Sequence, residues 1–172
     1  LSNFVEVFFE NGAVFNNNGT FLAQTNFGSG SDGFFDGGGG GTFNNTGTFT
    51  RDTTAGDFDI SVPFANSGTV NVATGTLSLS GGDGSGPTTG DFKISTGALL
   101  DFKDDFDLVA GADVTGTGTV DFSIGTVTLG NLTGSGNLNI GSANLDIGGN
   151  SSSPPVYTGS ISGAGGLIKT GN

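Results

Sequence analysis

The chain has 172 residues, of which 35 are glycine and only 12% are charged. Sixteen acidic residues against four basic ones give a net charge of −12, so the surface repels phosphate backbones and we expect no nucleic-acid partner. The absence of cysteine and histidine excludes disulfide bonds, thiol chemistry and the commonest general base.

Residues 1–14 contain the most apolar segment of the chain, LSNFVEVFFE. A strand with apolar side chains on both faces is normally covered on both sides. We expect it to be the first strand or cap of the domain or, because an open strand can pair with another molecule, a contact between subunits. With two apolar residues near the other end, it supplies the predicted self-assembly residues: Phe4, Val5, Val7, Phe8, Phe9, Leu167 and Ile168.

Three copies of one motif follow: FNNNGTF starts at Phe15, FNNTGTF at Phe43 and FANSGTV at Phe64. Their spacings of 28 and 21 residues fall within the period of about 20–50 residues that is typical of stacked repeats. Asparagine and glycine tolerate left-handed backbone conformations, so the shared Asn-x-Gly predicts a tight corner, after which threonine begins a strand.

If successive copies stack about 4.8 Å apart, equivalent side chains lie above one another. We therefore predict two interior ladders and one polar ladder at the corner. The interior ladders contain Phe15, Phe43 and Phe64, and Phe21, Phe49 and Val70; the polar ladder contains Asn17, Asn45 and Asn66. The alternative is three independent hairpins in an antiparallel β-sandwich.

The copies are irregularly spaced, and we interpret two glycine-rich segments, residues 28–41 and 81–90, as loop insertions. Residues 15–114 are therefore predicted to form irregular coils. From Thr115 the repeat is regular, since TGTGTVDFSIGTVTLGNL and TGSGNLNIGSANLDIGGN align with a period of 18 residues and bring Thr119 level with Asn137. We expect residues 115–172 to form regular coils that the end of the sequence truncates.

Together these patterns predict one all-β domain over residues 1–172, a right-handed parallel β-solenoid (β-helix). Its interior would hold Phe, Val, Leu and Ile, and its exterior Thr, Ser, Asn and Asp. No apolar run approaches the ~18 residues of a transmembrane helix, so we expect no membrane span.

Four aspartates, Asp101, Asp104, Asp105 and Asp107, are the strongest candidate metal site. Ca²⁺ takes about six to eight oxygen ligands, which closely spaced carboxylates can supply. The same charges could instead keep a solvated strand edge from aggregating. We expect no other cofactor and no catalytic residues, since the chain lacks histidine and tryptophan and offers only Tyr157 as a platform for a sugar ring.

The segment FANSGTVNVATGTLSLSGG (64–82) resembles the strand repeats of filamentous-haemagglutinin-like surface proteins, and YTGSISGAGGLIKTGN (157–172) resembles the autotransporter-associated β-strand repeat. The resemblance covers residues 43–82 and 115–172. It implies a parallel β-solenoid outside the cell, at the bacterial surface. We expect a structural fibre or stalk unit that assembles end to end with copies of itself. The alternative is an adhesin module that binds a polysaccharide or other glycan, or a host surface.

Overall fold

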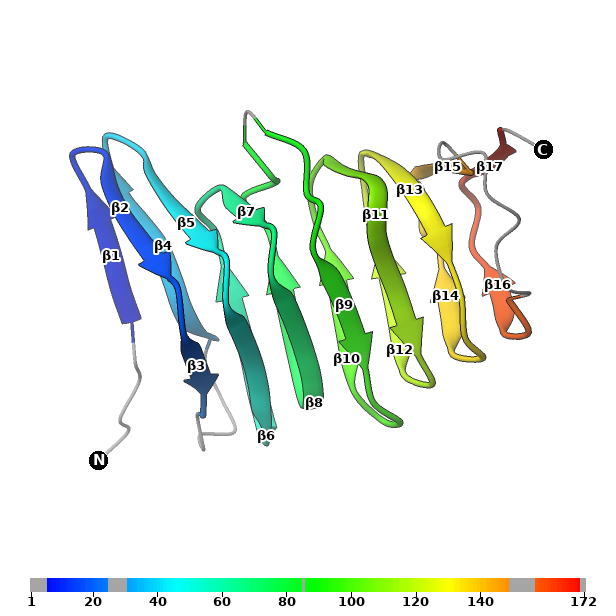
Figure 1. Ribbon diagram of the computed structural model, residues 1–172, viewed down its shortest axis with the longest axis horizontal. Helices are drawn as coiled ribbons and strands as arrows, with labels where there is room; N and C mark the ends of the chain where they lie inside the picture. The colour runs from blue at the N-terminus through cyan, green and yellow to red at the C-terminus, as the bar shows by residue number, and fades with distance from the viewer. Residues whose placement is uncertain (1–5, 25–30, 85, 149–156, 171–172) are drawn as a thin grey trace.

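The computed structural model describes residues 6–24, 31–84, 86–148 and 157–170, and the strands within these ranges pair in parallel. Successive turns of the chain stack along one axis, with the first coil at one end and the last coil at the other (Figure 1). The protein is a parallel β-solenoid, which confirms the predicted fold class. The antiparallel sandwich is wrong, and the right-handed sense of the winding stays a prediction.

None of the described residues forms a helix, so none forms one that could cross a membrane. The strands are β1 (Glu6–Glu10), β2 (Ala13–Asn17), β3 (Thr20–Ala23), β4 (Ser31–Gly38), β5 (Gly41–Asn45), β6 (Thr48–Ile60), β7 (Phe64–Asn66), β8 (Thr69–Leu79), β9 (Asp91–Ile94), β10 (Leu99–Phe102), β11 (Phe106–Gly116), β12 (Thr119–Phe122), β13 (Thr126–Leu132), β14 (Asn137–Asn139), β15 (Asn144–Ile147), β16 (Ser160–Ser162) and β17 (Gly166–Lys169).

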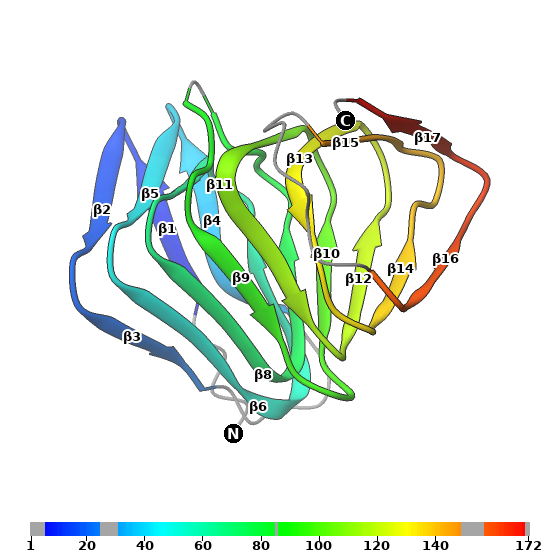
Figure 2. The same ribbon diagram turned by 45° about the vertical axis from the view of Figure 1, so that its right-hand side comes forward.

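The strands form three faces around the interior (Figure 2). The first face runs β1–β4–β6–β8–β10–β12–β14–β16. The second contains β2–β5–β7 and, further along the axis, β11–β13–β15–β17. The third runs β3–β6–β8–β9–β11–β13. The long strands β6, β8, β11 and β13 turn a corner and contribute to two faces each.

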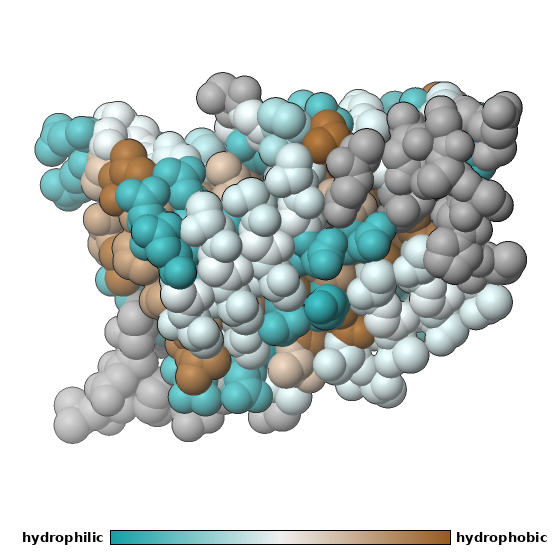
Figure 3. All heavy atoms as spheres, in the orientation of Figure 1, coloured by the Kyte–Doolittle hydropathy of each residue, from teal (hydrophilic) through white to brown (hydrophobic). Residues whose placement is uncertain are grey.

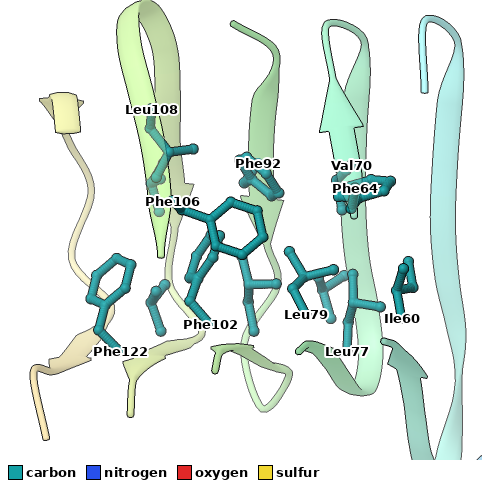
Figure 4. Close-up of a cluster of buried hydrophobic side chains, with 14 of the residues drawn as sticks. Ile60, Phe64, Val70, Leu77, Leu79, Phe92, Phe102, Phe106, Leu108 and Phe122 are labelled. Carbon is teal, nitrogen blue, oxygen red and sulfur yellow. The ribbon is translucent and has the colours of Figure 1, made fainter. Parts of the chain in front are cut away.

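Both predicted interior ladders are present. Phe15 pairs with Phe43 and Phe43 with Phe64, with ring centroids 5.1 Å apart in each case. The second ladder, Phe21 with Phe49 and Phe49 with Val70, lies on the neighbouring face. Further along the axis, side chains of successive strands continue to point into the same interior (Figure 4). Apolar side chains of successive coils therefore lie above one another, and the core is one continuous column.

The polar ladder at the corner is present too. Asn17 Nδ2 donates to Asn45 Oδ1 at 2.7 Å, and Asn45 Nδ2 donates to Asn66 Oδ1 at 2.8 Å. All three side chains are buried. The ladder ends because the next coil has Thr88 in this place, and Asn66 Nδ2 finds no partner among the described residues. Buried amides are costly unless they are hydrogen-bonded, so the ladder fixes the register of the first coils.

The glycine of the Asn-x-Gly corner is required for close stacking. A Cβ atom on Gly47 would lie 2.0 Å from the carbonyl oxygen of Gly19, and one on Gly68 would lie 2.1 Å from that of Gly47. Gly90 repeats the contact with Gly68 at 2.2 Å. None of these glycines has a positive φ angle, so the left-handed conformation expected from the sequence is wrong. The corner is tight because adjacent backbones touch there.

The structure corrects one of the two predicted loops. The described residues 81–84 and 86–90 lack a strand apart from an isolated bridge between Thr88 and Leu108. Residues 31–38, by contrast, form β4, and β5 begins at Gly41; residues 28–30 lie outside the described ranges. Glycine is needed at position 33 of this strand, because a Cβ atom there would lie 1.9 Å from the carbonyl oxygen of Asp59. In the C-terminal half, Thr119 pairs with Asn137 as predicted.

The charged side chain of Arg51 lies inside the column. The fully buried guanidinium of Arg51 donates to the carbonyl oxygens of Ala23 and Gly56, both at 3.1 Å, and of Thr76 at 3.2 Å. Burial lowers the pKa of Arg51, and the nearby carboxylates of Asp32 and Asp57 oppose that shift. Because its three acceptors belong to different coils, Arg51 ties the coils together where β6 turns its corner.

We predict that Gly68→Ala lowers the free energy of unfolding by about 1–3 kcal/mol, because the added methyl group would overlap the carbonyl oxygen of Gly47 and push the coils apart. Gly86→Ala is the matched control, since nothing lies within 4 Å of its Cβ position. Urea denaturation of both variants measures the difference, and equal stabilities would show that the corner is not closely packed.

Candidate functional site

The first coil leaves one end of the solenoid open. Among the described strands, β1, β2 and β3 each pair on one side only. We call this surface the N-terminal end. Its exposed apolar side chains, with the exposed fraction of each, are Val7 (42%), Phe8 (56%), Val14 (57%), Phe15 (36%) and Leu22 (53%). Figure 3 shows apolar side chains gathered at this end.

A shallow hollow of about 200 Å³ lies within the N-terminal end, between β1 and β2. Its lining residues are all of apolar type: Val7, Phe8, Phe9, Ala13, Val14 and Phe15. Single exposed apolar residues are normal on a protein surface, but a contiguous group beside open strand edges marks a contact site.

The last described coil leaves the opposite end open in the same way. Here β16 pairs only with β14 and β17 only with β15 within the described ranges. We call this surface the C-terminal end. Ile161, Leu167 and Ile168 are exposed on it, at 41%, 50% and 53%. Both ends therefore combine unpaired strand edges with apolar side chains.

The predicted self-assembly residues separate into three groups. Val7, Phe8, Leu167 and Ile168 are exposed at the two ends. Phe4 and Val5 lie outside the described residues. Phe9 is a correction, because it is only 4% exposed and packs against Phe34 with ring centroids 5.7 Å apart. Four further end-surface residues were not predicted from the sequence: Val14, Phe15, Leu22 and Ile161, of which Phe15 was predicted only as the first member of its ladder.

The four candidate metal ligands do not converge. Asp101 lies on β10 and accepts a hydrogen bond from Ser123 Oγ at 2.8 Å. Asp104 and Asp105 lie in the turn before β11, and Asp105 Oδ1 accepts from the backbone N–H of Thr126 at 2.8 Å. Asp107 is exposed on β11. The described part of the chain contains no group of three acidic side chains placed to hold a metal ion, and calcium binding stays a prediction.

An acidic row runs along the outside of the first face. Asp59, Ser78, Asp101 and Asp121 occupy paired positions on successive strands. Lys103 Nζ lies 3.6 Å from Asp101 Oδ2, 3.7 Å from Asp57 Oδ2 and 2.8 Å from Ser78 Oγ. Burial raises the pKa of Asp59, and burial followed by the charge of Asp101 raises the pKa of Asp121. The stacking that aligns the core thus also aligns like charges outside it.

We predict that Asp121→Asn stabilises the protein at pH 7. A carboxyl group whose pKa is higher in the folded than in the unfolded state binds more protons when folded, so stability rises as the pH falls from neutrality through the raised pKa. Since the side chain is partly exposed, the gain should stay below about 1 kcal/mol, or about 2–4 °C in Tm.

Thermal unfolding between pH 7 and pH 3 tests this prediction. The advantage of Asp121→Asn should shrink as the pH falls, because wild-type Asp121 then becomes protonated. Asp52→Asn is the control, since it makes the same change in net charge at an exposed position. Equal Tm changes in both variants would contradict a specific destabilisation of the folded state by the ionised carboxylate of Asp121.

A polar groove of about 260 Å³ lies on the outside of the second face, next to the loop 81–90. Its lining residues are Asn16, Asn44, Thr46, Ala65, Asn66, Ser67 and Pro87. Asn44 Nδ2 donates to Asn16 Oδ1 at 2.8 Å, and Thr46 Oγ1 donates to Asn18 Oδ1 at 2.8 Å. The groove presents amide and hydroxyl groups, which are suited to a neutral polar ligand.

A scan against protein-family models finds no match to the chain, and neither a search of curated proteins nor a search of solved structures finds one.

Proposed function

We propose that this chain is a structural fibre or stalk unit of a bacterial surface protein, in which solenoid coils stack end to end. The observation that carries the proposal is that both ends expose apolar side chains beside open strand edges. The resemblance of residues 43–82 and 115–172 to surface-protein repeats supports an extracellular location.

The parallel strand direction supports head-to-tail stacking. In a parallel solenoid the two ends are unlike, so identical units join through different surfaces. Contacts of this kind produce open filaments when they do not close into rings. The net charge of −12 supports growth along the axis, because the acidic sides of neighbouring fibres repel one another.

We predict that the purified chain forms elongated particles whose mean length grows with protein concentration, as measured by sedimentation velocity and electron microscopy. Val14→Asp should reduce this growth, because it places a charge among the apolar side chains of the N-terminal end. Ile124→Asp is the matched control: Ile124 is 54% exposed, against 57% for Val14, but lies between β12 and β13 away from both ends.

Strictly monomeric wild-type protein at high concentration would contradict the proposal. So would equal association of the Val14→Asp and Ile124→Asp variants, because the ends would then have no special part in assembly.

The polar groove favours a second candidate function, an adhesin module that binds a neutral glycan. Its amide and hydroxyl groups and its position beside the loop 81–90 support this alternative. Binding to a glycan array that Asn44→Ala abolishes, and that Asn144→Ala on the distant strand β15 leaves intact, would support it. An array without any bound glycan, or binding that Asn44→Ala does not change, would rule out this groove as the binding site.

A further inference from the structure

The polar groove lies where an outward-facing row of the second face loses its amide side chains. Along β2, β5 and β7 this row contains Asn16, Asn44 and Ala65, which pair in register. The first two copies of the motif, FNNNGTF and FNNTGTF, have asparagine at this offset, whereas the third copy, FANSGTV, has alanine. The groove therefore contains the place where one amide of a stacked row is missing.

Pro87 borders this place on the other side. The N–H of Thr89 donates to Asn66 O at 2.9 Å, and this backbone bond places Pro87 next to Ala65 in the following coil. The side chain of Ala65 ends at its Cβ atom, while its neighbours in the row, Asn44 and Pro87, carry longer side chains. The outer surface is consequently hollowed above Ala65.

The amide row stops with an unused acceptor. Asn44 Nδ2 donates to Asn16 Oδ1 at 2.8 Å. The two polar atoms of an amide point away from each other, so Asn44 Oδ1 is directed to the opposite side, toward the coil of Ala65. Within the described part of the chain no group donates to this oxygen. An asparagine at position 65 would do so, and alanine leaves the acceptor open to a donor from outside the protein.

We infer that the polar groove binds a neutral sugar that carries an acetamido group, with the amide N–H of the sugar on Asn44 Oδ1 and its methyl group between Ala65 and Pro87. This inference rests on the adhesin function proposed for the groove and names the class of sugar. In a trans amide the N–H and the methyl group lie on the same edge, so both can face the groove together. A hydroxyl group would supply the donor but would leave the two apolar lining residues uncovered.

The size and charge of the groove agree with a single neutral sugar ring. Its volume of about 260 Å³ lies below the range of about 300–1,000 Å³ that is typical of sites for larger ligands. The exposed hydroxyl groups of Thr46 and Ser67 can donate to and accept from the hydroxyl groups of the ring. The net charge of −12 disfavours acidic sugars. For one ring in an open site we expect a dissociation constant of about 1 mM.

The first test is an NMR titration of the isotope-labelled chain with free N-acetylglucosamine and with glucose. The two sugars differ only at the acetamido group, so their comparison isolates its contribution. N-acetylglucosamine should shift the backbone signals of Asn44 and Ala65, and glucose should bind about tenfold more weakly or less. Equal affinities, or no shift of Ala65 with N-acetylglucosamine in large excess, would overturn the inference.

The second test is Ala65→Asn, which fills the hollow with the amide that the other two motif copies carry. Its urea midpoint should equal or exceed that of the wild type, because the new amide donates to Asn44 Oδ1. Its affinity for N-acetylglucosamine should fall about tenfold or more, since the new side chain occupies the place of the acetamido group. Ala164→Asn makes the same change at an exposed position between β16 and β17 and should keep the wild-type affinity.

Wild-type affinity in a folded Ala65→Asn variant would contradict the inference. Asn44→Ala provides a second variant, which removes the acceptor without filling the hollow. It should bind N-acetylglucosamine no better than glucose, and a preference that survives this substitution would also overturn the inference.

The outcomes separate the class of sugar from the function of the groove. A glycan without an acetamido group that binds the wild type but not Asn44→Ala would keep the adhesin function and overturn the inferred class. A glycan array without any bound glycan would remove both. The proposed fibre depends on association of the chain, which the Ala65→Asn variant should leave unchanged.

Discussion

The direct contact of one coil's backbone with the next is the constraint on which the rest of the structure depends. At the Asn-x-Gly corner this contact leaves no room for a Cβ atom on the following coil, so the coils can approach closely only where that coil carries glycine. Once the corners are aligned, the asparagines hydrogen-bond along the axis and the phenylalanines of successive coils meet ring to ring. Close stacking at the corner thus fixes the register of the polar and the apolar ladders together.

Stacking of this kind stabilises each coil by contacts with its two neighbours. The first and last coils have a neighbour on one side only. The exposure of Val7, Phe15, Ile161 and Leu167 follows from this, because these residues occupy the same rows as the buried core. The same stacking also produces the acidic row outside the first face. It places the like charges of Asp101 and Asp121 on adjacent strands, which is unfavourable. End-to-end assembly, as proposed, would use the same contacts between neighbouring coils that already build the interior.

The ladders could be predicted from the sequence because three motif copies place the same residues at the same offsets. The strand β4 could not, since a run of glycines indicates a loop unless the close approach of Gly33 to the Asp59 carbonyl is known. The orientation of Phe9 was ambiguous because apolar residues occupy both faces of β1. Arg51 gave no local signal, as its acceptors lie 5, 25 and 28 residues away in the chain. The four aspartates were close in sequence, but strand and turn geometry separates their side chains.

The most direct test of stacking is a disulfide cross-link between coils. Asn18 and Thr46 are exposed, 28 residues apart, and in side-chain contact at 2.8 Å. Oxidation of the doubly substituted chain Asn18→Cys/Thr46→Cys should give a quantitative intramolecular disulfide, detected by mass spectrometry, in protein that keeps its fold. Free thiols in the folded, oxidised protein would show that the two motif copies do not lie on each other, and the stacked account would be wrong.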